Sequence, residues 1–275
     1  MKHWPVSVSQ ITILLLYLLA AIAFAMSRLP NYAARTQPLL IAAVSFVAAG
    51  LMLHGQELYG EVYQATGLRL SIASAASLIG LQLALIGLLG ALEPTLRGMT
   101  AGLLLLASVA MIPMGLQPAA AVTTELTWQL RAHILTALFA YGLLTAGAIV
   151  AIYALVQDRR LRTGKLSSGN RLFAPLETTE KMLFGVAATG FSGLLLAVVS
   201  GFAFVEDLFA QHLVHKTAFS LLALLLFGVL IAGRLFAGWR GKRAVYLYLW
   251  GFAFLCLAYF GSRFILEEVL GRSWG

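Results

Sequence analysis

The sequence predicts an all-α protein, a polytopic membrane helix bundle of about eight transmembrane helices. Apolar residues make up 60% of the 275 positions and charged residues only 11%, whereas an ordinary soluble domain carries roughly 25% charged residues. Long apolar runs alternate with short polar segments, and the mean hydropathy is +0.88. A hydrocarbon core of about 30 Å needs about 20 helical residues to cross it. Since every backbone amide inside the membrane must be paired, apolar runs of this length should be helices.

Eight apolar runs define the expected spans, which together form one membrane domain over residues 1–275. The first run is expected to be a retained anchor and not a cleaved signal, because seven more runs follow it. The fifth is too long for a straight crossing and should extend beyond the membrane at one end. The expected spans are 6–26, 38–53, 70–92, 99–116, 128–156, 182–205, 213–236 and 244–266.

The distribution of Lys and Arg residues predicts the orientation. Loops that follow odd-numbered spans carry thirteen of these residues, and the opposite side carries six. Basic residues favour the cytoplasmic side, so both termini should lie outside, on the periplasmic face of the inner (plasma) membrane. The net charge of +8 is then mainly a topology signal. It predicts contact with membrane lipid and no nucleic-acid partner.

Several kinds of chemistry have no signature in this chain. The single cysteine, Cys256, lies in the eighth span, and the sequence has no Cys-x-x-Cys-His motif for covalent haem attachment. The Gly164-Lys165 pair lacks the spacing of a phosphate-binding loop. Because no nucleophile–base constellation stands out either, we expect a protein that is not an enzyme.

All five histidines fall on the predicted outer side: His3, His54, His133, His212 and His215. Neutral imidazole is a common ligand of haem iron, and ionisable groups at membrane depth tend to mark function. A histidine at the end of a span can also be a simple interface anchor. A weaker alternative is a divalent-metal site formed by His212 and His215 with the preceding Glu206 and Asp207.

Several segments resemble the haem-handling membrane proteins of cytochrome c assembly, the CcsA/CcmC-like superfamily, and most closely its YpjD-type eight-span inner membrane branch. The resemblance is strongest over residues 130–268. The segments that carry it are HILTALFAY (133–141), PLETTE (175–180), GVAATGFSG (185–193), HKT (215–217), GWRGKRA (238–244) and LAYFGS (257–262).

The resemblance implies non-covalent haem b, and other cytochrome c assembly subunits as partners. In that superfamily a histidine followed eight positions later by a tyrosine opens a span at the outer surface and ligates haem iron, which His133 and Tyr141 match. His215 is then the expected second axial ligand. His54 is expected to converge on the same pocket, as the alternative ligand or as a neighbour of the ligands.

Two departures from the superfamily pattern leave a second function open. The segment 204–215 contains no tryptophan, where a tryptophan-rich haem platform is expected, and residues 267–275 contain no histidine. The alternative is therefore a haem-free accessory or regulatory subunit for a transporter on the same scaffold.

Two further expectations concern single residues. Arg131, two positions before His133, is a candidate to pair with a haem propionate, although a snorkelling interface arginine is the simpler explanation. The small residues Gly185, Gly190 and Gly193 of the sixth span should form one face that packs closely against at least two neighbouring spans.

Overall fold

The computed structural model describes residues 7–64, 67–68, 72–113, 127–163, 174–204 and 214–261. In these residues eight α-helices are present: α1 (Val8–Met26), α2 (Thr36–Val62), α3 (Ile72–Gly90), α4 (Arg97–Ala110), α6 (Trp128–Arg162), α7 (Leu176–Phe204), α8 (Val214–Ala237) and α9 (Gly241–Cys256). Shorter described elements are two 3-10 helices (Pro30–Arg35 and Pro94–Leu96), a π-helical turn (Leu257–Gly261) and an antiparallel hairpin of β1 (Tyr63–Gln64) and β2 (Gly67–Leu68).

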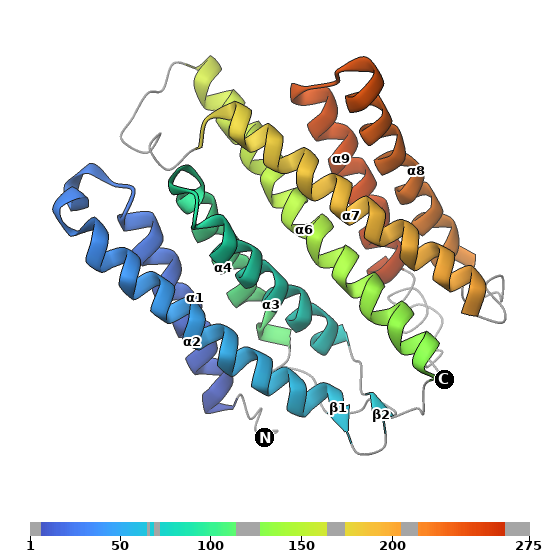
Figure 1. Cartoon of the computed structure of the whole chain (residues 1–275), viewed down its shortest axis with the longest axis horizontal. Helices are drawn as coiled ribbons and strands as arrows, with labels where there is room; N and C mark the ends of the chain where they lie inside the picture. Colours follow the sequence, from blue (N-terminus) through green and yellow to red (C-terminus); the bar gives the residue numbers. More distant parts are fainter. Residues whose placement is uncertain are drawn as a thin grey trace. The chain divides into compact units, whose positions relative to one another are not determined.

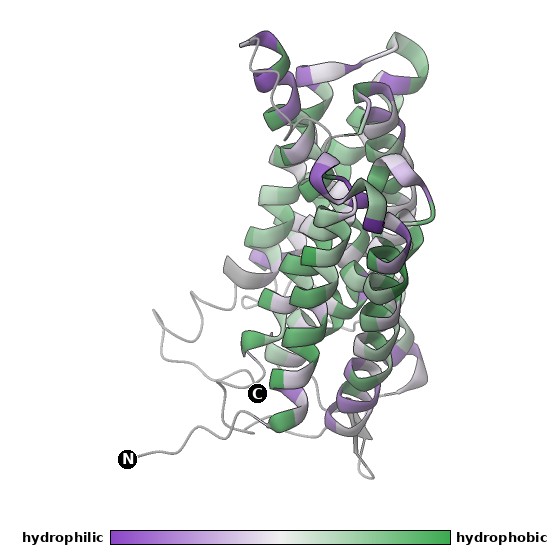
Figure 2. Cartoon of the chain, turned by 90° about the vertical axis from the view of Figure 1, so that its left-hand side faces the viewer, coloured by the Kyte–Doolittle hydropathy of each residue, from purple (hydrophilic) through white to green (hydrophobic). Residues whose placement is uncertain are grey.

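These helices confirm the predicted all-α membrane bundle, since each expected span coincides with one of them. The helices α1, α3, α6, α7 and α8, and the segment that contains α2, are long and apolar enough to cross a membrane. Figure 2 shows hydrophobic residues along the lengths of the helices and hydrophilic residues concentrated at their ends. The protein is therefore a multi-pass membrane protein.

Some helix ends differ from the expected ones, because backbone hydrogen bonding, and not apolarity, sets where a helix stops. The second span was expected to end near residue 53, yet α2 continues to Val62. His54 consequently lies inside this helix and is fully buried, which corrects its expected position at a span end. The helix α4 has 14 residues and rises only about 21 Å; the expected end of its span near residue 116 lies outside the described residues.

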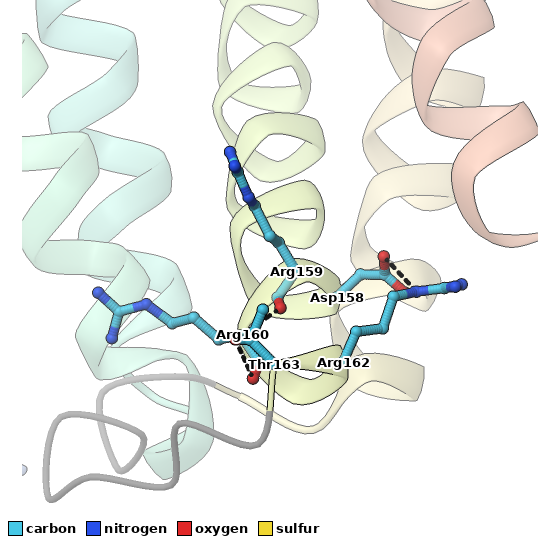
Figure 3. Close-up of polar contacts among 5 residues, drawn as sticks. All are labelled: Asp158, Arg159, Arg160, Arg162 and Thr163. Atoms are coloured by element: carbon cyan, nitrogen blue, oxygen red, sulfur yellow. Dashed lines mark hydrogen bonds and ion pairs between the residues drawn. The ribbon is translucent and has the colours of Figure 1, made fainter.

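The helix α6 confirms the prediction of an over-long fifth span. It has 35 residues, or about 52 Å at 1.5 Å per residue. Figure 3 shows its last turn, where Asp158 and Arg162 form an ion pair of 3.0 Å and the Thr163 hydroxyl donates to the carbonyls of Arg159 and Arg160. Basic side chains at a helix C-terminus interact favourably with the helix dipole.

The chain divides into two compact units. The first comprises Met1–Leu126 with Val156–Thr179, and the second comprises Thr127–Leu155 with Glu180–Gly275. Both are built from apolar helices, and the expected single membrane domain over residues 1–275 stays a prediction.

In the first unit, α1 packs against α2 and α4, and α3 packs against α2 and α4 (Figure 1). The start of α1 is stabilised by a capping box, in which Ser7 and Gln10 each satisfy the other's backbone amide. The ring of Tyr17 lies directly on Gly50 of α2, where a Cβ would come within 2.7 Å of it. A glycine at this position therefore lets the buried tyrosine reach α2.

In the second unit, small residues bring the helices together. A Cβ on Gly190 of α7 would lie 2.7 Å from Leu144 of α6, and one on Gly193 would lie 3.1 Å from Ala140. Gly228 of α8 lies against Phe191 of α7. Close packing through the glycine face is therefore confirmed toward α6 for Gly190 and Gly193, whereas the contact with α8 is made by Phe191, so packing of that face on a second neighbour stays a prediction. Gly185 is the exception, because it is exposed and no described atom lies within 4 Å of its Cβ position.

The turn between α8 and α9 is fixed by a carboxylate. Gly238 and Gly241 adopt positive φ angles of 62° and 61°, which glycine tolerates without steric cost. Glu180 of α7 accepts hydrogen bonds from Arg240 Nε (2.9 Å) and from the backbone amide of Gly241 (3.0 Å). The negative charge thus lies at the N-terminus of α9, where the helix dipole favours it.

The orientation can be tested at the two ends of α6. In a Cys256→Ser background, we expect a membrane-impermeant maleimide to label Thr127→Cys in intact spheroplasts and Thr163→Cys only after lysis, because the basic end of α6 should face the cytoplasm. Both positions are exposed, so each should react once the reagent reaches it. Labelling of Thr163→Cys alone in intact spheroplasts would reverse the predicted topology.

Candidate functional site

His133 lies in the second turn of α6, at the end of the second unit where α6 begins and α7 ends. Its Nδ1 is 2.9 Å from the hydroxyl oxygen of Ser200 on α7. That hydroxyl donates to the carbonyl of Ala197 at 3.0 Å, so its oxygen is left to accept the hydrogen of Nδ1. In this tautomer Nε2 carries the lone pair of the ring.

The backbone of α7 supports the imidazole from one side. A Cβ on the buried Gly201 would lie 3.1 Å from His133 Cε1, which is tighter than ordinary van der Waals contact. The ring is therefore held by a hydrogen bond at Nδ1 and by close contact with the Gly201 backbone. Such second contacts orient metal-binding histidines and raise the basicity of the ligating nitrogen.

A group of polar and aromatic side chains lies near His133 in the second unit. The Tyr141 hydroxyl donates to the carbonyl of Leu255 (3.0 Å), and its ring meets the edge of the Tyr259 ring with centroids 5.7 Å apart. The ammonium of Lys216 lies 5.8 Å from the centroid of Tyr259. Lys216 is also close enough to His133 for their charges to interact.

The π-helical turn Leu257–Gly261 carries Tyr259 to this group. A change from i→i+4 to i→i+5 hydrogen bonding alters the pairing of carbonyls at the junction, and such turns are frequent at functional sites. The Tyr141 hydroxyl supplies a donor at that junction. Helices α6, α7, α8 and the end of α9 therefore each place a polar group at this end of the unit.

No described contact joins the other predicted site residues of the second unit to His133. His215 is exposed in the first turn of α8, and Arg131 is half-buried in the first turn of α6. The pairing of His133 with His215 stays a prediction. His3, His212, Glu206 and Asp207 lie outside the described residues, and no group of three His, Cys, Asp or Glu side chains able to hold a metal ion occurs in the described ranges.

His54 belongs to a different network, in the first unit. The Tyr17 hydroxyl is 3.1 Å from His54 Nδ1, and His54 Nε2 is 2.8 Å from the Ser77 hydroxyl oxygen. Ser77 in turn donates to the sulfur of Met111 at 3.2 Å. The donors run in one direction, from tyrosine to histidine to serine to thioether, and all four side chains are buried.

Both ring nitrogens of His54 are therefore occupied in this arrangement. A nitrogen must surrender its hydrogen bond before it can bind iron, so the network supports a structural role that joins α1, α2 and α3. The expected convergence of His54 with His133 and His215 concerns side chains of two units, and it stays a prediction.

The His54 network makes a prediction about stability. His54→Ala should destabilise the protein by about 2–4 kcal/mol, because it leaves a cavity and removes the partners of two buried hydroxyls. Tyr17→Phe should cost only about 1 kcal/mol. Thermal unfolding in detergent measures both, with the exposed Gln56→Ala on the same helix as control. A His54→Ala midpoint equal to that of the control would show that the network carries no stability.

The fold defines a polytopic helical membrane protein, and in its second unit the His133 imidazole of α6 is held against Ser200 and Gly201 of α7. The family model described as cytochrome C assembly protein matches residues 8–270, so the chain belongs to the cytochrome c assembly protein family. This membership confirms the resemblance found in the sequence.

Individual relatives agree with the family. The inner membrane protein YpjD of Escherichia coli (strain K12) is 32% identical over 145 residues, which are 53% of this chain and 55% of that protein. An uncharacterized 28.8 kDa protein of Azospirillum brasilense is 28% identical over 141 residues, 50% and 52% of the two chains. The cytochrome c biogenesis protein CcsA of Heterosigma akashiwo is 27% identical over 115 residues, 41% and 35% of the two chains.

The chain spans about half the length of the curated relatives it matches. No solved structure shows a significant match to it.

Sequence reasoning missed three residues of the site: Ser200, Lys216 and Tyr259. Ser200 lies on the same helix as Gly185, Gly190 and Gly193 but beyond the small residues that sequence reasoning considered. Lys216 follows the predicted ligand His215 directly, and this adjacency was the available signal, although the lysine was counted only as a topology charge. Nothing in the local sequence marks Tyr259 as a neighbour of Tyr141, 118 positions earlier.

Proposed function

We propose that this protein is a haem-handling membrane protein of cytochrome c assembly, in which His133 is an axial ligand of haem iron at the outer face of the inner membrane. The observation that carries the proposal is the state of the imidazole. Its Nδ1 is held by Ser200, at 2.9 Å, which leaves the lone pair of the ring on Nε2. Haem-binding histidines use this arrangement, with one nitrogen hydrogen-bonded and the other on the iron.

The residues present suit non-covalent haem b. Without a Cys-x-x-Cys-His motif, the porphyrin would be held by axial ligation and by contacts with its edge and face. His215 is the proposed second axial ligand, since it opens α8, and Arg131 is a candidate for a propionate. Bound haem would supply a redox-active iron, while the protein binds, orients and shields it without acting as an enzyme. The proposed partners are lipid and other assembly subunits.

The alternative, a haem-free accessory or regulatory subunit for a transporter, is favoured by two observations. The segment 204–215 has no tryptophan to form a haem platform. In addition, His54 has both ring nitrogens hydrogen-bonded. On this alternative the His133–Ser200 pair would only connect α6 with α7.

The visible spectrum of the purified full chain separates the two functions. After titration with haemin in detergent, the first predicts a saturable Soret band and, on reduction, separate α and β bands at one haem per chain. A folded protein that gives only the spectrum of free haemin would overturn haem handling and favour the accessory subunit. The protein should be tested in a lipid nanodisc as well, since detergent can displace a ligand held near the membrane surface.

A further inference from the structure

We infer that Lys216 is the carboxylate-binding residue of the His133 site and orients an anionic ligand there. The inference rests on the proposed function, because it assigns one haem propionate to the Lys216 ammonium. It places this role on a residue other than Arg131, which the sequence alone had favoured.

The position of Lys216 carries the inference. Its side chain emerges from the first turn of α8 and lies over the Tyr259 ring at 5.8 Å, not extended along the helix surface. Tyr259 touches Tyr141 of α6, so the ammonium lies on the inner side of α8, toward α6 and the end of α9.

The position of the Lys216 ammonium over Tyr259 is unfavourable for a lysine whose only role is to set the orientation of the protein in the membrane. An interface lysine normally extends its ammonium to water, and a charge turned toward the interior of a membrane bundle is costly and tends to mark function. The aromatic face of Tyr259 compensates part of that cost through a cation–π contact.

The chemistry of the site selects the ligand class. His133 offers a neutral nitrogen to a metal, Tyr141 and Tyr259 offer aromatic surface, and Lys216 offers a positive charge. A metalloporphyrin with carboxylate side chains satisfies all three. A charge-assisted hydrogen bond in a partly desolvated site is stronger than a neutral one, so the carboxylate should contribute to both affinity and orientation.

The test compares haemin with haemin dimethyl ester, in which both propionates are neutral. In the wild-type protein we expect haemin to bind about ten-fold more tightly or better, a ratio typical of one hydrogen bond to a charged group. Lys216→Met should remove most of this preference while keeping the Soret band that His133 produces. Lys216→Arg should retain the preference, and Lys242→Met, a control at an exposed position in the first turn of α9, should leave it unchanged. Arg131→Met tests the other candidate for the propionate.

The outcomes separate this inference from the proposed function. If the wild type binds both porphyrins equally, or if Lys216→Met keeps the preference, the inference is overturned and haem handling still stands. If Arg131→Met removes the preference instead, the propionate belongs to Arg131. If the wild type binds neither porphyrin, haem handling fails and this inference with it. Size-exclusion profiles of the variants without haem establish whether each one folds. If Lys216→Met does not fold, the comparison of Lys216→Arg with the wild type tests the role of the positive charge.

Discussion

The His133→Ala variant should lose the Soret band of the haemin-loaded protein while it remains folded in the membrane. The substitution removes an imidazole whose Nδ1 is held by a neighbouring helix. Only the exposed His215 would remain as a proposed axial ligand, so the affinity for haem should fall by about 100-fold, as when a metal site loses a ligand or its support. Haemin titration followed by absorbance measures the change.

Two companion variants make this result specific. Thr136→Ala changes a half-buried residue one turn further along α6 and should leave the spectrum unchanged. His215→Ala should keep the haem but shift the ferric spectrum from low-spin toward high-spin, because it removes the proposed second ligand and leaves His133 in place. A normal bis-histidine spectrum in His133→Ala would exclude this residue from the site.

The course of the helices was largely predictable, because apolar runs of membrane length have few alternatives to a helix. The over-long α6 is an example, since its apolar and basic segments contain no breaker before Thr163. The end of α2 was not predictable in this way. Its last turns are polar but still helical, so an apolarity boundary placed the end nine residues too early. His54 was therefore expected at the end of the span, whereas it is fully buried inside α2.

The partners of the histidines could not be predicted from local sequence. Ser77 lies 23 positions from His54 and Ser200 lies 67 positions from His133, and several serines in each helix could have filled either role. What decides the role of each imidazole is whether its partners occupy one nitrogen or both. That is a property of tertiary packing, which is why His54 and His133 looked equivalent in the sequence and differ in the structure.

The same limit applies to the small residues of α7. Gly185, Gly190 and Gly193 are separated by five and three positions, and five positions at about 100° per residue turn a side chain to the other side of the helix. Gly190 and Gly193 share a face toward α6, whereas Gly185 faces away and is exposed. The number of small residues in α7 identified it as a closely packed helix. The rotation of about 100° per residue decides which of its glycines contact α6.

This difference gives a matched pair of variants on one helix. Gly190→Leu should destabilise the protein by about 1–3 kcal/mol, the usual cost of overpacking a tight interior. Even the first added carbon would lie 2.7 Å from the Leu144 side chain and 3.5 Å from its backbone nitrogen. Leu144 is fully buried, and its carbonyl accepts the hydrogen bond of Tyr248, so it has little room to move.

Gly185→Leu introduces the same side chain five residues earlier in α7, where no described atom lies within 4 Å of the new Cβ. It should be neutral or slightly stabilising, because leucine forms helix more readily than glycine by about 1 kcal/mol. Thermal unfolding in detergent should therefore give a lower midpoint for Gly190→Leu than for the wild type and an unchanged or higher one for Gly185→Leu. Equal midpoints for the two variants would mean that α7 does not pack on α6 through its Gly190 face. The contact between His133 of α6 and Gly201 of α7 depends on the same packing and would then also be in doubt.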